Sequence, residues 1–118
     1  MVVICERAYE NIDNDSMNEH FEKFPFPLSD FQKYAIDGIV HNHHVLVTAH
    51  TGSGKTLPAE FAIDYFCKQK KKVIYTSPIK ALSNEKYHDF CKKFPDYNVG
   101  ILTGDIKFNP NADIIIMT

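Results

Sequence analysis

The residues with the clearest chemical potential form one short loop: His50, Thr51, Gly52, Ser53, Gly54, Lys55 and Thr56. Between a strand and a helix, such a loop points successive backbone N–H groups at an anion, and the helix dipole adds to the attraction. The glycines permit backbone torsions that a side chain would block. Lys55 can reach the β- and γ-phosphates of a nucleotide, and the Thr56 hydroxyl can bind Mg²⁺. We therefore predict a phosphate and magnesium site here.

The alternative for this loop is a glycine-rich connection that binds nothing. The usual pattern, G-x-x-x-x-G-K-[ST], begins with glycine, whereas this chain has Ala49 at that position. A small residue still fits there. The apolar run before the loop, the helical pattern after it and the Lys-Thr pair in register favour phosphate binding.

Gln32 has two interpretations that the sequence leaves open. Its amide can both donate to and accept from adenine, which would select ATP over other nucleotides. Ser29 and Gln32 also form the S-x-x-Q pattern of a capping box at the start of a helix. Both roles use the same amide, and spacing alone does not choose between them.

Strands and helices alternate along the chain and must position these residues. We expect a helix from Ser29 to about Asn42, and after it strand Val45–Ala49, helix Lys55–Lys70, strand Val73–Ser77, helix Ala81–Phe94, strand Val99–Leu102 and strand Asp113–Thr118. This alternation predicts an α/β fold with a parallel sheet and flanking helices. Residues 1–28 are expected to be an extended lead-in, and residues 29–118 the domain itself.

Polar residues follow the predicted strands at the points where the strands end. Ser77, Pro78 and Lys80 follow one strand, Thr103, Gly104 and Asp105 follow the next, and Thr118 ends the last. In parallel α/β sheets, ligands bind at the carboxyl ends of the strands. We therefore expect these residues and the phosphate loop to share one working edge. The lysine-rich run 68–72 precedes a strand, so we interpret it as a solvated helix end on the opposite edge.

Composition limits the classes of function. The chain has 118 residues, 44% hydrophobic and 24% charged, with a net charge of −2. Such a balance provides no general basic surface, so any polynucleotide contact must come from a local site. No apolar run approaches the ~18 residues of a membrane span. Three cysteines without C-x-x-C spacing are expected to be free thiols. We expect an intracellular protein, nuclear or cytoplasmic, that is neither secreted nor membrane-bound.

Five motifs follow one another along the chain: F-P-F-P-L-S-D-F-Q, A-H-T-G-S-G-K-T, T-S-P-I-K-A-L-S-N-E-K-Y, G-I-L-T-G-D and I-I-M-T. Together they resemble the first RecA-like domain of superfamily-two DExH-box RNA helicases, most closely the RNA-exosome-associated, superkiller-like branch. The similarity covers about residues 24 to 118. A phosphate loop alone occurs in many P-loop NTPase families. The motif T-S-P-I-K-A-L-S-N, at its distance after the loop, reduces the number of families that the chain resembles.

The resemblance implies roles by position. Phe31 and Gln32 match the adenine-recognising Q-motif, and Thr51 to Thr56 match the ATP and Mg²⁺ site, with Lys55 and Thr56 acting in catalysis. The residues implied to hold the sugar-phosphate backbone of single-stranded RNA are Ser77, Pro78, Lys80, Asn84, Thr103, Gly104, Asp105 and Thr118. Glu85 stands where family members commonly have Gln, and its carboxylate would repel phosphate.

The implied function is that of an ATP-dependent RNA helicase, which couples ATP binding and hydrolysis to RNA unwinding and translocation. Hydrolysis requires a Walker-B aspartate and an adjacent glutamate, and neither Asp105 nor Asp113 fits that pattern. We therefore expect the ATP-binding N-terminal part of a helicase, truncated before the Walker-B strand. A second RecA-like domain and the RNA exosome machinery are implied partners. The alternatives are an orphan nucleotide-binding module without turnover, or another P-loop NTPase or kinase.

Overall fold

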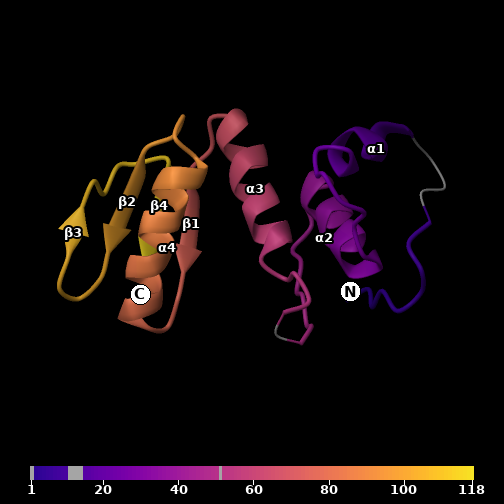
Figure 1. The fold of residues 1–118 in the computed structure, drawn as a ribbon, viewed down its shortest axis with the longest axis horizontal. Coiled ribbons are helices and arrows are strands. Elements are labelled where there is room, and N and C mark those ends of the chain that lie inside the picture. The colour runs from indigo at the N-terminus through magenta and orange to yellow at the C-terminus, as the bar shows by residue number, and fades with distance from the viewer. Residues whose placement is uncertain (1, 11–14, 51) are drawn as a thin grey trace. The chain divides into compact units, whose positions relative to one another are not determined.

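The computed structural model describes residues 2–10, 15–50 and 52–118, except for the side chains of residues 15 and 16 (Figure 1). The chain forms two compact units, residues 1–62 and residues 63–118. The elements are α1 (Asp15–Phe21), α2 (Asp30–Val40), α3 (Leu57–Lys68), β1 (Val73–Thr76), α4 (Lys80–Lys93), β2 (Val99–Leu102), β3 (Lys107–Phe108) and β4 (Ile114–Met117). None of the described helices combines the length and apolar character needed to cross a membrane.

The second unit contains a four-stranded sheet in the order β1-β4-β2-β3. β4 lies between β1 and β2 and is parallel to both, whereas β3 is antiparallel to β2. The predicted strands that form, β1, β2 and β4, are parallel as expected, and β3 makes the sheet mixed by adding an antiparallel strand that was not predicted. The chain turns back directly after β2, so that Lys107 and Phe108 pair with Leu102 and Ile101. A strand of two residues has no hydrophobic period from which it could be predicted.

The core of this unit lies on one face of the sheet. Ile114 and Ile116 of β4 are completely buried, and they pack with Phe90 of α4 and with Ile63 and Cys67 of α3. In Figure 1, α4 lies across the sheet. Each fully buried isoleucine or phenylalanine stabilises the fold by roughly 1.5–3 kcal/mol. These contacts fix α4, and with it the loop that leads from β1 into the helix.

The first unit is built around α2. Ala35 and Ile36 are buried on its inner face, and Met17 of α1 is buried in the same unit, where α1 contacts α2. The N-terminal segment is also attached to α2, because the Tyr9 hydroxyl donates a hydrogen bond of 2.6 Å to Asp37. Burial, together with this bond, raises the pKa of Tyr9. Residues 1–28 are therefore not wholly an extended lead-in, since packing against α2 gives a polar segment a helical turn that its sequence did not indicate.

The strand predicted over Val45–Ala49 is absent, and residues 43–50 have no regular secondary structure. Among the described residues, no backbone hydrogen bond joins this segment to a strand. β-branched composition favours a strand only where a neighbour satisfies the backbone groups, and here Leu46 remains 89% exposed. α3 also begins at Leu57, two residues later than predicted, and ends at Lys68 instead of Lys70.

We expect Gly100→Ala to destabilise the second unit by about 1–3 kcal/mol, because overpacking forces the backbone to shift. An added Cβ at position 100 would overlap the carbonyl oxygen of Asn109, which is backbone and cannot move aside. Urea denaturation followed by circular dichroism measures the loss. Gly104→Ala is the matched control, since its Cβ would meet only the mobile end of Lys80, 3.3 Å away. Equal stabilities of the two variants would contradict the expectation.

Candidate nucleotide loop and nucleic-acid edge

The phosphate loop, residues 50–56, is bent by two glycines in the left-handed region. Gly52 has φ 86° and Gly54 has φ 87°, conformations that L side chains rarely adopt. The Ser53 N–H and hydroxyl both donate to the His50 carbonyl, at 3.2 and 2.5 Å. Thr51, a predicted phosphate contact, lies outside the described residues. The loop therefore has the turn that its composition predicted, although no strand precedes it.

Three consecutive backbone donors stand just before α3. The N–H groups of Gly54, Lys55 and Thr56 donate to no other described residue, and α3 begins directly after them at Leu57. The side chains of Lys55 and Thr56 are exposed. Amide donors at a helix N-terminus, an ammonium and a hydroxyl form a donor set suited to phosphate and Mg²⁺. Gly54, Lys55 and Thr56 therefore have the chemistry needed to hold the predicted phosphate and Mg²⁺.

Gln32 connects the start of α2 with the phosphate loop. Its Oε1 accepts a hydrogen bond from the Ser29 N–H at 3.0 Å, and its Nε2 donates to the Gly54 carbonyl, also at 3.0 Å. The side chain is only 6% exposed. The capping interpretation of Gln32 is thus confirmed, while adenine recognition by Gln32 and the partly buried Phe31 stays a prediction. Because a Cβ on Gly54 would lie 2.6 Å from Gln32 Nε2, glycine is also required here for the close approach.

The carboxyl edge of the sheet, formed by Ser77, Thr103 and Thr118, is set by strand register. Thr76 of β1 and Leu102 of β2 both pair with Met117 of β4. The next residue of each strand therefore emerges at the same level. Backbone bonds continue the alignment, with the Ser77 N–H donating to the Met117 carbonyl and the Thr118 N–H to the Leu102 carbonyl. The structure thus brings together polar residues that lie up to 41 positions apart (118 − 77).

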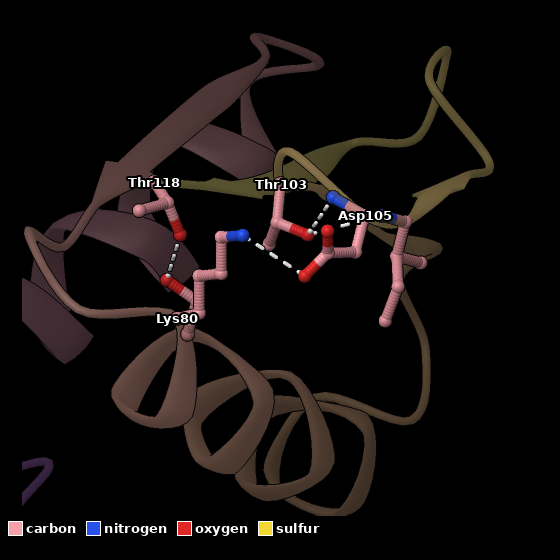
Figure 2. Close-up of polar contacts among 6 residues, drawn as sticks. Lys80, Thr103, Asp105 and Thr118 are labelled. Carbon is pink, nitrogen blue, oxygen red and sulfur yellow. Dashed lines mark hydrogen bonds and ion pairs between the residues drawn. The ribbon is translucent and has the colours of Figure 1, made fainter.

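Lys80 and Asp105 meet at this edge. Lys80 Nζ, at the start of α4, lies 2.9 Å from Asp105 Oδ2 (Figure 2). The turn carrying Asp105 is held by Thr103, whose Oγ1 accepts hydrogen bonds from the N–H groups of Asp105 at 3.2 Å and Ile106 at 3.1 Å. Gly104 lies beneath the end of the Lys80 side chain. Lys80, Thr103, Gly104 and Asp105 therefore form one cluster, as predicted.

Ser83 also belongs to the edge, although the sequence analysis did not select it. Its Oγ lies 2.8 Å from Thr118 Oγ1, and the side chain is completely buried. The usable signal was a small hydroxyl one helical turn after Lys80, on the inner face of α4. The predicted contacts Pro78 and Asn84 are exposed, and Ser77 is buried. No described interaction joins these three side chains to the cluster, so their roles stay predictions.

The phosphate loop belongs to the first unit, and the carboxyl edge belongs to the second. A surface shared by the two therefore stays a prediction of the sequence. Each site by itself already has a definite chemistry. The loop offers donors to an anionic ligand, and the edge combines hydroxyls with one ammonium that a carboxylate occupies.

Comparison with known proteins gives a consistent result. The sequence model of the DEAD/DEAH box helicase family matches residues 29–118. The chain is 45% identical over 117 residues to the antiviral helicase SKI2 of Saccharomyces cerevisiae, covering 99% of this chain and 9% of that protein. It is 48% identical over 97 residues to the exosome RNA helicase MTR4 of Homo sapiens, covering 82% of this chain and 9% of that protein. The predicted resemblance to the exosome-associated helicases is confirmed.

Solved structures support the fold. The chain superimposes on a crystal structure of the DUF1998 helicase MrfA bound to DNA and AMPPNP, with a TM-score of 0.67 and 18% identity. The match covers 95% of this chain and 18% of that one. The expected RecA-like helicase fold is thereby confirmed. This chain spans about a tenth of the length of the curated relatives that it matches.

We expect Gln32→Ala to lower the free energy of unfolding by about 1–2 kcal/mol, because α2 loses its cap and the Gly54 carbonyl loses its donor. Gln32→Glu separates the two effects, since its carboxylate still accepts from Ser29 but cannot donate to Gly54. We expect that variant to keep most of the stability while amide exchange in residues 52–57 becomes faster. Denaturant unfolding and hydrogen exchange measure these quantities. Identical behaviour of both variants and the unsubstituted chain would refute the connecting role of Gln32.

Proposed function

The chain belongs to the DEAD/DEAH box helicase family, and on that basis we propose that it is the ATP-binding N-terminal part of an ATP-dependent RNA helicase. The whole protein would couple ATP binding and hydrolysis to RNA unwinding and translocation. The observation that supports this most directly is the carboxyl edge, where Lys80, Thr103 and Thr118 come together from three separate elements. A surface of this kind is suited to a polar ligand bound along the carboxyl ends of the strands.

ATP is the proposed ligand of the phosphate loop. The N–H groups of Gly54, Lys55 and Thr56 would hold phosphate oxygens, the Lys55 ammonium would neutralise charge, and the Thr56 hydroxyl would bind Mg²⁺. The metal ion supplies further neutralisation of the charge that develops during phosphoryl transfer. Gln32 donates one amide hydrogen to the Gly54 carbonyl of the same loop, and in the proposed complex its remaining donor and acceptor capacity would recognise adenine.

Single-stranded RNA is the proposed ligand of the carboxyl edge. The chain carries a net charge of −2, so affinity for a polyanion must come from a local group, and Lys80 is a cation that lies within the cluster at this edge. Hydroxyl and ammonium donors contact phosphates and sugars without reading bases. This chemistry suits a protein that must move along RNA of any sequence.

The proposed partners follow from the relatives. MTR4 is described as an exosome RNA helicase, and we extend that association with the RNA exosome machinery to the protein from which this chain comes. A second RecA-like domain would complete the ATP site by providing arginines for phosphoryl transfer. An intracellular location, nuclear or cytoplasmic, fits a partner that processes RNA.

We expect Lys55→Ala to weaken magnesium-dependent ATP binding at least tenfold, because the loop loses its only side-chain cation directed at the β- and γ-phosphates. Isothermal titration calorimetry with Mg-ATP measures the affinity. Lys72→Ala, which removes an exposed lysine outside the loop, is the control and should bind like the unsubstituted chain. If Lys55→Ala and the control bind equally well, the loop is not the nucleotide site.

We expect Lys80→Ala to weaken binding of single-stranded RNA and to reduce the salt dependence of the affinity by at most about 0.7 in log–log slope, the full share of one phosphate contact. Fluorescence anisotropy of a labelled oligouridine, at several salt concentrations, provides both values. Lys72 precedes β1 and so lies at the other end of the sheet. Lys72→Ala should therefore leave the affinity and the slope nearly unchanged, and an equal loss in both variants would argue against the carboxyl edge.

A further inference from the structure

The Lys80 ammonium at the carboxyl edge is already paired with an anion of the protein itself. Lys80 Nζ lies 2.9 Å from Asp105 Oδ2, and the side chains are 53% and 71% exposed. Ion pairs of this exposure are weak, because water and salt screen them and both side chains lose freedom. The pair can therefore be exchanged for another partner at little cost. A phosphate oxygen of RNA can accept the same charge-assisted hydrogen bond from the ammonium that the carboxylate accepts.

The position of the carboxylate is built into the turn after β2. Thr103 Oγ1 accepts hydrogen bonds from the N–H groups of Asp105 and Ile106, and the Thr103 N–H donates to the Ile106 carbonyl at 2.8 Å. These bonds close the turn and hold Asp105 toward α4. Gly104 has no side chain, so the end of Lys80 passes over the turn to reach Oδ2 (Figure 2). The closed turn therefore keeps the Asp105 carboxylate within reach of the Lys80 ammonium.

A phosphate that approaches Lys80 must also approach Asp105. Two unit charges of like sign a few ångströms apart repel each other, and more strongly near a protein surface than in bulk water. The Lys80 ammonium therefore cannot pair with the Asp105 carboxylate and an RNA phosphate equally well at the same time. Either the phosphate displaces the carboxylate, or the carboxylate weakens the contact with the phosphate.

We propose that Asp105 is an internal competitor for the RNA phosphate, which occupies Lys80 in the free protein and is displaced when single-stranded RNA binds the carboxyl edge. The proposal rests on the proposed function, since it takes the carboxyl edge as the RNA site, and it changes the role assigned to Asp105. The carboxylate does not contact the RNA backbone. It lowers the affinity of the edge, so that RNA is held firmly enough to bind and weakly enough to be released.

The experiment compares oligouridine binding by the full chain and four variants across roughly 50 to 200 mM salt. Asp105→Asn keeps the size of the side chain and removes its charge, and we expect it to bind about three- to tenfold more tightly. Its salt slope should be steeper by up to about 0.7, because Lys80 then releases a full counterion equivalent. In a Lys80→Ala background, Asp105→Asn should improve binding by less than half as much on a logarithmic scale.

Asp96→Asn is the matched control for charge. Asp96 is exposed and precedes β2, whereas Asp105 follows it, so the same change of net charge is made at the opposite end of the strand. Circular dichroism melts of every variant establish that each is folded. Both Lys80 and Asp105 are exposed, so we expect little change in stability.

Each outcome decides a separate point. Weaker RNA binding by Asp105→Asn would mean that the carboxylate positions Lys80 for RNA, and would overturn the proposal. An equal gain in Asp96→Asn would reduce the effect to net charge, and would also overturn it. If the unsubstituted chain and all variants fail to bind oligouridine, the RNA assignment of the edge is wrong and this proposal fails with it. Binding that is unaltered in Asp105→Asn rejects the competitor role alone.

Discussion

The pairing of β4 with a parallel strand on each side is the interaction on which the rest of the structure depends. It buries Ile114 and Ile116 completely and aligns the ends of β1, β2 and β4. A slip of one residue would turn the buried isoleucines to the other face. The same slip would move Thr118 away from Thr103 and from Ser83. Stability and the composition of the edge are therefore set by one register.

The first unit depends in a similar way on a single amide. Gln32 closes the first turn of α2 with one end and holds the Gly54 carbonyl with the other. A residue selected by helix capping thus also orients the loop with the phosphate donors. Because the amide is buried, the two contacts cannot be exchanged for water without loss. The cap of α2 and the shape of the phosphate loop are therefore coupled at this position.

The hydrophobic periodicity of the sequence predicted an element correctly where the element forms its own hydrogen bonds or pairs with nearby strands. The range of β2 agrees with the prediction, and α4 differs by only one residue at each end. Periodicity gave a wrong prediction where the formation of a strand depends on a partner elsewhere in the chain. The segment 45–49 has the composition of a strand but no described strand pairs with it, and β3 exists only because a turn returns it to β2. Among the site residues, the Lys80 cluster followed from the rule that ligands bind at strand ends, whereas Ser83 required knowledge of which face of α4 is buried.

The Thr103 hydroxyl shows how a turn can select the sign of its ligand. Threonine usually serves as donor or acceptor, because its oxygen has two lone pairs and one hydrogen. Here amides of the turn occupy both lone pairs, and only the hydrogen remains for an outside group. A hydrated cation, which needs lone pairs, gains nothing at such a hydroxyl, while an oxygen that carries negative charge can accept the remaining hydrogen. Because the closed turn uses both acceptor positions of Thr103, its hydroxyl can act toward a ligand only as a hydrogen-bond donor.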